Sequence, residues 1–155
     1  MLAKTGATAW AAAAALREPR RPSGSVGELG RALSDPDPVT RGLAAIELRA
    51  RGADARPALD ALTAALRDPD VSVRMMSANA IAAIGNGAAP SVPALIAACS
   101  VQDEQVHALR ACATALGAIG RPATPALPVL RRIAKQPRVR WAAEAAIRSI
   151  GGDAP

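Results

Sequence analysis

Few side chains in this sequence are of the types that carry out catalysis. His107 is the only histidine among 155 residues, and Cys99 and Cys112 are the only cysteines. They form no Ser/His/Asp set, no Cys/His set and no metal-ligand cluster, and there is no glycine-rich loop with a lysine to hold a phosphate. We therefore expect no catalytic residue, metal or cofactor, a structural or solvent-facing role for His107, and two buried thiols.

Arginines are the side chains whose spacing suggests binding. Three of them share one position of an internal repeat and a fourth is displaced by one residue: Arg41, Arg74, Arg140 and Arg110. One interpretation is a ladder of ion pairs, in which each arginine meets an aspartate such as Asp37 or Asp70 of its own or a neighbouring unit. The other is a row of guanidinium groups along one ridge, suited to carboxylates or phosphates.

A second column is basic at its ends and small in its middle: Arg17, Arg49, Ala82, Gly117 and Arg148. This pattern suits a protein segment with acidic flanks, since a continuous phosphate track would need positive charge throughout. Trp141, beside Arg138 and Arg140, is an anchor candidate because Trp and Arg are enriched at binding hot spots. Alternatively, Trp141 covers the core of the last unit. The partner-binding candidates are Trp141, Arg138, Arg140, Arg148, Arg49, Arg110, Arg74 and Arg41.

An internal repeat of about 33 residues positions these side chains. Glycines end the long predicted helices at spacings of 33, 35 and 31 residues: Gly52, Gly85, Gly120 and Gly151. Four residues before each glycine stands a large aliphatic residue: Leu48, Ile81, Leu116 and Ile147. A proline precedes each shorter helix: Pro57, Pro90 and Pro125. Two helices form each unit, and stacking of units buries the apolar faces that one pair cannot bury alone.

Composition agrees with closely packed helices. Half of the residues are hydrophobic, yet the chain has two tryptophans and no Phe or Tyr, which disfavours a β-sandwich. The net charge of +6 permits an anionic partner without establishing one. No run of about 18 apolar residues is present, so we expect no membrane span. We expect a cytoplasmic protein, with export through the weakly apolar stretch 7–16 as the alternative.

The pattern D-P-D-x-x-V-R-x-x-A-x-x-A-L-x-x-I-G, followed by x-x-x-P-A-L-x-x-L, is kept best in residues 68–85 and 90–95. It resembles the short HEAT-like repeats found in phycobiliprotein lyases and in many bacterial scaffolds. The resemblance implies an all-α, right-handed α-solenoid of antiparallel helix pairs, HEAT-like or armadillo-like. We expect four repeats, at about 24–52, 53–85, 86–120 and 121–151. Residues 1–23 would supply an N-terminal capping helix and turn, and residues 152–155 a disordered tail.

The expected function is that of a non-catalytic scaffold or adaptor, with a protein partner bound along the long-helix face. The partner would be acidic, or the chain would be part of a longer repeat array. One alternative is nucleic-acid binding through the basic ends, as in some HEAT-like DNA-repair glycosylases. Another is a phycobilin-lyase-like enzyme or lyase subunit, although nothing marks a tetrapyrrole site. Some HEAT-like hydroxylases bind two iron atoms through repeated His-Glu pairs, and this chain has no such pair.

Overall fold

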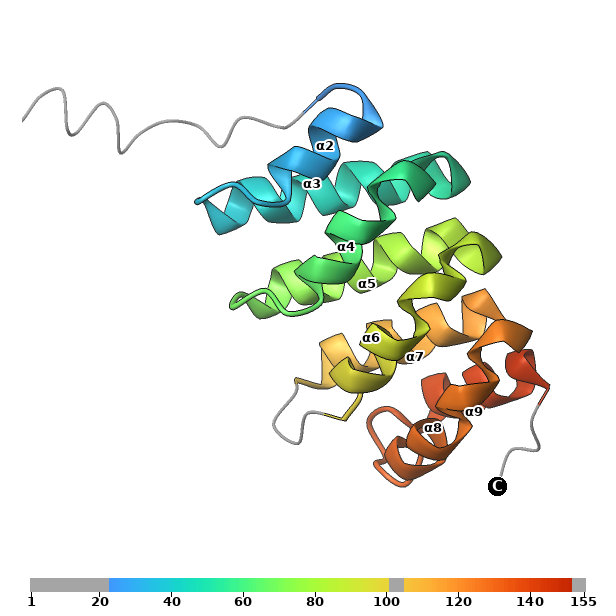
Figure 1. Ribbon diagram of the computed structural model, residues 1–155. Helices are drawn as coiled ribbons and strands as arrows, with labels where there is room; N and C mark the ends of the chain where they lie inside the picture. The colour runs from blue at the N-terminus through green and yellow to red at the C-terminus, as the bar shows by residue number, and fades with distance from the viewer. Residues whose placement is uncertain (1–22, 101–104, 152–155) are drawn as a thin grey trace, which may run out of the picture.

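The computed structural model describes residues 23–100 and 105–151, which form two layers of helices (Figure 1). One layer holds the short helices α2 (Val26–Ala32), α4 (Leu59–Ala65), α6 (Val92–Ala98) and α8 (Leu127–Ile133). The other layer holds the long helices α3 (Pro38–Arg51), α5 (Val71–Ile84), α7 (Val106–Ile119) and α9 (Arg140–Ile150). Each short helix pairs with the long helix that follows it, and the pairs stack, so the predicted all-α solenoid is confirmed.

Three 3₁₀ helices join one pair to the next: η1 (Gly52–Ala58), η2 (Gly85–Ser91) and η3 (Arg121–Ala126). The sequence did not predict them, but the prolines Pro57, Pro90 and Pro125 lie inside them. The proposed capping helix falls in residues 1–22, which lie outside the described part of the chain, as does the tail 152–155.

The long helices end at the four glycines that the spacing predicted. Their backbone φ angles are positive: Gly52 at +55°, Gly85 at +70°, Gly120 at +75° and Gly151 at +92°. A residue with a Cβ is strained at such angles, whereas glycine is not. Each long helix therefore ends where a glycine allows the backbone to turn to a positive φ angle.

Two of the long helices begin at a repeated Asp-Pro-Asp turn. The Asp37 amide donates to Asp35 Oδ1 at 2.9 Å, and the Asp37 carboxylate accepts the amide of Val39 at 3.1 Å. Asp68 and Asp70 repeat this arrangement at the start of α5. The second aspartate of each turn thus caps its helix by accepting backbone N–H groups that have no partner in the first turn.

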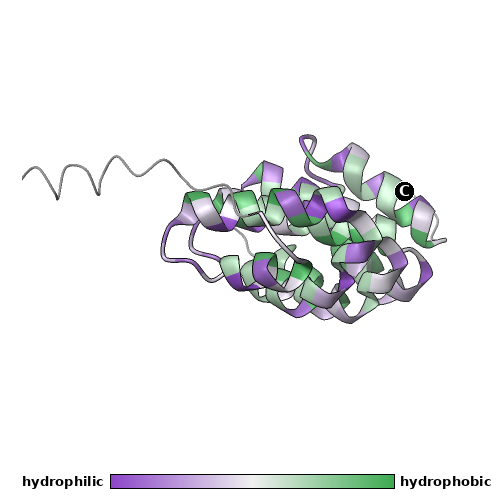
Figure 2. Cartoon of the chain, turned by 90° about the horizontal axis from the view of Figure 1, so that it is seen from above, coloured by the Kyte–Doolittle hydropathy of each residue, from purple (hydrophilic) through white to green (hydrophobic). Residues whose placement is uncertain are grey.

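The core lies where the two layers meet, and Figure 2 shows these layers from above, with hydrophilic positions on the turns at one edge. One aliphatic column is completely buried: Leu48, Ile81, Leu116 and Ile147 are each 0% exposed. Small residues allow neighbouring long helices to approach closely. A Cβ on Gly117 of α7 would lie 2.9 Å from Cα of Ala146 on α9, which is closer than van der Waals contact.

The two end units carry carboxylates at positions that the other units fill with buried alanine. Glu47 aligns with Ala80, Ala115 and Ala146, which are at most 2% exposed, and Glu144 aligns with Ala45, Ala78 and Ala113, which are 0% exposed. Glu47 and Glu144 themselves are partly exposed. Stacking another unit on either end in the same register would bury a carboxylate, which is costly unless the charge is paired.

One stretch is apolar enough in composition to be compared with a membrane span. Val71–Ala98 has a mean hydropathy of 1.4 in its most apolar 18-residue window. In this structure the stretch is α5, η2 and α6, which turn at Gly85 and contribute Ile81 and Leu95 to the core. The pattern is that of core helices in a stacked repeat.

Candidate functional site

The Asp-Pro-Asp turns and the arginines beside them lie along one edge of the stack, which we call the turn edge. Arg41 belongs to it. Its guanidinium binds the Asp68 carboxylate of the next unit in a bidentate pair, with Nε–Oδ2 at 2.7 Å and Nη2–Oδ1 at 2.8 Å. Nη1 donates to the carbonyl oxygens of Asp35 at 2.9 Å and Pro36 at 3.1 Å. The interpretation as an inter-unit ladder holds for Arg41, but the carboxylate is Asp68, because Asp37 and its repeat equivalent cap their own helices.

The Arg41–Asp68 pair is largely shielded, with the two side chains 12% and 7% exposed. Burial by itself raises the pKa of Asp68, but hydrogen bonds from Arg41 and the Asp70 amide, with the charges of Arg41 and Arg74, lower it below its ordinary value. The hydrogen bond to Asp68 in turn raises the pKa of Arg41. The pair is therefore fully ionised at neutral pH and joins the first unit to the second.

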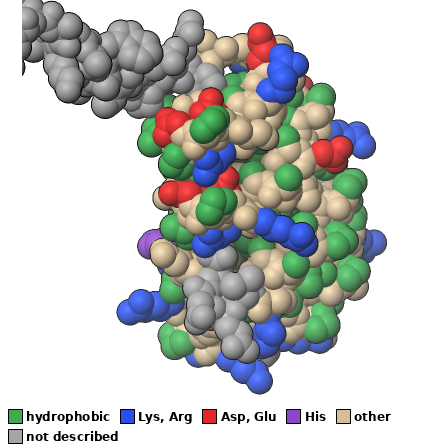
Figure 3. Space-filling model, turned by 60° about the vertical axis from the view of Figure 1, so that its left-hand side comes forward, with side chains coloured by type: hydrophobic (Ala, Val, Ile, Leu, Met, Phe, Trp, Pro, Cys, Tyr) green, Lys and Arg blue, Asp and Glu red, His purple; other side chains and the backbone are tan. Residues whose placement is uncertain are grey.

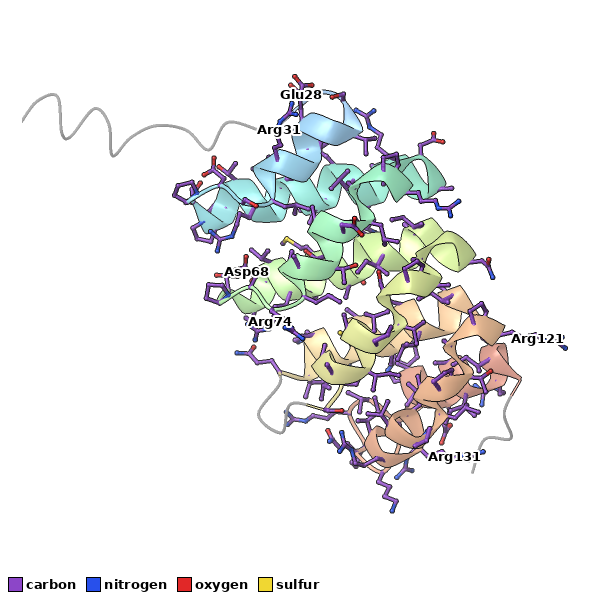
Figure 4. The ribbon with its side chains drawn as sticks, viewed as in Figure 1. Glu28, Arg31, Asp68, Arg74, Arg121 and Arg131 are labelled. Carbon is purple, nitrogen blue, oxygen red and sulfur yellow. The ribbon has the colours of Figure 1, made fainter. Side chains whose placement is uncertain are left out.

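Arg74 and Arg140 occupy the same repeat position and also contact backbone. Arg74 Nη1 donates to the carbonyl oxygen of Asp68 at 2.8 Å, and Arg140 Nε donates to that of Ala134 at 3.4 Å. Asp68 and Arg74 lie beside each other at this edge in Figure 4. Three of the predicted binding arginines thus support the turns.

The other predicted residues belong to the long-helix face. This face consists of positions three, six, ten and thirteen residues before each stop glycine, a spacing that places them on one side of a helix. Arg138 is the exception, because it lies in the turn before α9. Because α3, α5, α7 and α9 pack in succession, equal positions form rows across the face. The members are Val39, Gly42, Ile46 and Arg49; Ser72, Met75, Asn79 and Ala82; His107, Arg110, Thr114 and Gly117; and Arg138, Trp141, Ala145 and Arg148.

The structure brings Arg110, Trp141 and the backbone of Arg138 together at the α7–α9 end of this face, and Arg148 follows Trp141 two turns later on α9. We call Arg110, Arg138, Trp141 and Arg148 the cationic corner. The guanidinium carbon of Arg110 lies 5.4 Å from the centroid of the Trp141 ring, within range of a cation–π contact. Arg110 Nη2 also donates to the Arg138 carbonyl at 3.2 Å. Trp141 is 58% exposed, so it is not a lid over the last core, and Arg148 is exposed as well. Arg49 is exposed on α3, in the first unit, apart from this corner.

An apolar groove at the opposite end of the face was missed from the sequence. It has a volume of about 230 Å³ and lies between the first halves of α3 and α5, lined chiefly by Pro38, Val39, Leu43, Ile46 and Met76. Val39 is 51% and Ile46 is 41% exposed. Gly42 lowers the floor of the groove, since a Cβ there would lie 3.0 Å from Met76 Sδ. The sequence did contain an indication of this groove. Val39 and Ile46 are both large and apolar, lie two turns apart, and are on the side of the helix opposite its buried stripe.

Charge is distributed unevenly between the two halves of the described chain. Residues 105–151 contain eight Lys and Arg against one carboxylate, a net charge of +7. Residues 23–100 contain seven arginines against eight carboxylates, a net charge of −1. Figure 3 shows red and blue side chains together in the upper part of the molecule, whereas the charged side chains coloured in the lower part are blue. Over the full sequence the contrast is smaller, with a net charge of +2 for residues 1–100 and +4 for residues 101–155. The cationic corner lies in the more basic of these two parts.

Side chains suited to metal binding do not cluster in the described part of the chain. Within residues 23–100 and 105–151, no three His, Cys, Asp or Glu side chains lie close enough to hold a metal ion. His107 is exposed at the start of α7, and Cys99 and Cys112 are buried thiols, as predicted.

The stacked helix pairs define a helical-repeat protein. The HEAT-repeat pattern matches residues 27–99 and 59–151, and the chain belongs to the HEAT-repeat family. No curated protein matches it. Among solved structures, human deoxyhypusine hydroxylase in complex with glycerol is similar, with 31% sequence identity and a TM-score of 0.67.

The match to the hydroxylase covers 86% of this chain and 46% of that enzyme, so the chain spans less than half of its length. An engineered protein is also similar, with 22% identity and a TM-score of 0.65 over 82% of this chain and 63% of that one. This second likeness concerns the fold alone.

Proposed function

We propose that this protein is a non-catalytic scaffold that holds a protein partner on the long-helix face. One observation carries the proposal. The three large hydrophobic side chains that the described residues expose, Val39, Ile46 and Trp141, all lie on this face. Exposed apolar groups gathered on one surface and bordered by charge are typical of binding sites.

The contacts of the other arginines support the choice of face. Arg41 and Arg74 are engaged with the turns, whereas Arg110 lies over the exposed Trp141 ring, and Arg138 and Arg148 are exposed at the same end of the face. An aromatic ring with flanking arginines resembles the residues that contribute most to measured protein interfaces. The role proposed for the turn edge is to fix the angle between units, and that for the long-helix face is to bind.

The proposal is tested by capture from the native host, with the purified protein as bait and mass spectrometry as readout. Trp141→Ala and Arg148→Glu are expected to lose the captured partner while their circular dichroism spectra stay helical. Arg131→Glu is the matched control, because it makes the same charge change on α8, in the other layer. Capture that survives both face variants, or that is lost equally in the control, contradicts the assignment.

Nucleic-acid binding is the second candidate, favoured by the net charge of +6 of the chain, of which residues 101–155 carry +4. Phosphate binding by several cations weakens steeply, by about 10³–10⁵-fold for six to ten contacts, between 50 and 200 mM salt. Retention on single- or double-stranded DNA or RNA at low salt, with this steep loss, would select that function. A protein partner seated partly by apolar contact is expected to remain bound over the same range.

A further inference from the structure

We infer that the long-helix face fixes the direction of its partner: an acidic segment with apolar residues at one end lies across the helices, its apolar end in the apolar groove and its carboxylates on the cationic corner. This inference rests on the proposed function and adds the chemistry and orientation of the partner segment.

The long-helix face has two chemically different ends. At the position thirteen residues before the stop glycine, the side chain changes from Val39 on α3 to Arg138 before α9. Ten residues before it, Gly42 on α3 gives way to Arg110 on α7 and Trp141 on α9. The same repeat positions therefore form an apolar groove at one end and a cationic, aromatic surface at the other.

Charge complementarity decides the orientation. The α3–α5 end carries the carboxylate of Asp70 in the lining of the groove, with Arg49 as the cation of α3 on the face. The α7–α9 end presents Arg110, Arg138 and Arg148, and Glu144 is the one carboxylate among residues 105–151. An acidic residue is attracted more strongly to this second end, with its three arginines, so the apolar part of the same segment is directed to the groove.

The arginine at the centre of the corner is held in place before a partner arrives. Stacking on Trp141 and the hydrogen bond to the Arg138 carbonyl restrain the Arg110 guanidinium. Restraint reduces the side-chain entropy lost on binding a carboxylate. The planar guanidinium still has N–H groups beyond that hydrogen bond, and a carboxylate can accept two of them.

The spacing of the two ends fixes the length of the segment. The groove is centred between α3 and α5 and the corner between α7 and α9, two helix spacings apart. Packed helices lie about 8–10 Å apart, which places the centres roughly 16–20 Å from each other. An extended chain covers this distance in about five or six residues, and a helix in about eleven to thirteen.

A second copy of this chain is the rival occupant. Its stacking on either end in register would bury Glu47 or Glu144 among positions that the inner units fill with alanine. The long-helix face itself would present the same cations to each other in a symmetric pair. An acidic partner fits better, and the oligomeric state at micromolar concentration tests the rival directly.

The test uses three labelled peptides of one composition and about 14 residues. One has leucines at its N-terminal end and glutamates at its C-terminal end, one is its reverse, and one alternates the two residue types. Fluorescence anisotropy with the full chain is expected to show that one of the two block peptides binds at least about tenfold more tightly than the alternating peptide. Ile46→Ser and Arg110→Gln should each weaken that peptide, and only Arg110→Gln should lower its salt dependence.

Arg131→Gln serves as the matched control, since it removes one positive charge from α8; Figure 4 shows Arg131 at the lower end of the stack. A photocrosslinker at the leucine end should label residues 38–46 or 71–76, and one at the glutamate end should label residues 105–114 or 138–148. Equal affinity for all three peptides, absence of binding, or crosslinks in the reverse order overturns the inference. So does tighter binding of an oligothymidine of similar charge, which would select nucleic acid, or self-association that competes with the peptides.

Failure of the orientation and failure of the proposed function give different results. If the three peptides bind equally and Trp141→Ala abolishes all binding, the face binds proteins without a fixed direction. If the partner captured from the host is unaffected by Trp141→Ala and Arg148→Glu, the proposed function itself is wrong.

Discussion

Ser77 and Ser91 are both completely buried, yet we predict that replacing them with alanine changes stability in opposite directions. Each is 0% exposed. The Ser77 hydroxyl on α5 is buried and has no hydrogen-bond partner within the described residues. The Ser91 hydroxyl lies 2.6 Å from the Thr63 hydroxyl, close enough for a strong hydrogen bond. The difference between the two serines is therefore one of pairing.

Ser77→Ala should stabilise the protein. A buried polar group without a partner costs about 1–3 kcal/mol, which alanine recovers. Alanine also forms helix slightly better than serine, by up to a few tenths of a kcal/mol. The site accepts small apolar groups, because the equivalent positions are Ala44, Cys112 and Ala143, all buried. We expect a gain in unfolding free energy of about 1–3 kcal/mol.

Ser91→Ala should destabilise the protein by about 0.5–1.5 kcal/mol, the net value of one hydrogen bond. The loss is limited because the Thr63 hydroxyl keeps its second contact, with the Leu59 carbonyl at 2.7 Å. No buried donor is therefore left without a partner.

Thermal unfolding followed by circular dichroism measures both effects. In a chain of this size, 1 kcal/mol corresponds to about 2–4 °C in Tm. Urea unfolding with two probes checks that the stacked units unfold together, since repeat arrays can lose cooperativity. A lower Tm for Ser77→Ala, or equal shifts of the same sign in both variants, would falsify the assignment of one unpaired and one paired hydroxyl.

Two further predictions concern helix packing and acid stability. Gly117→Ala should lower the unfolding free energy by about 1–3 kcal/mol, because its Cβ would lie 2.9 Å from Cα of Ala146; Gly30→Ala is the control, with only an ordinary 3.5 Å contact, and should be neutral or stabilising by up to about 1 kcal/mol in thermal unfolding. The pKa values of Asp37 and Asp68 are lowered from the ordinary 3.8, so their contribution to stability is complete above that pH and is lost as the pH falls through the lowered values. Asp68→Asn should be less stable at pH 7 and should lose less on further acidification, and an unfolding free energy with the same pH profile as the unchanged protein would contradict the role given to this carboxylate.

The repeat could be predicted because its signals are local. A glycine at Gly52 or Gly85 ends a helix through its own φ angle, and an aspartate such as Asp70 caps a helix through amides two and three residues away. The aliphatic column around Leu48 follows from helical period alone. These features require no knowledge of which helices meet, so the fold class followed from the sequence.

The partner of Arg41 could not be predicted in the same way. The sequence alone allows Arg41 to pair with Asp37, Asp68 or Asp70. The packing of the first unit on the second places the Asp68 carboxylate against the Arg41 guanidinium. The cationic corner has the same origin, since Arg110 and Trp141 are 31 residues apart and meet because α7 packs on α9. The sequence predicted each of these residues as a partner-binding candidate, but it did not indicate which of them would form a site together.

The sequence by itself determined the helix pairs, their starts and stops, and the row positions along the long helices, because those depend on backbone angles and on the period of one helix. Tertiary structure alone decided which side chains stay exposed and which of them meet. The sequence places the apolar Val39 and Ile46 opposite the buried stripe of their helix, but it does not show whether a neighbouring helix covers them. In the structure they stay exposed and line a groove between α3 and α5. Exposure depends on what a neighbouring unit covers, and that is set by the distance and angle between units.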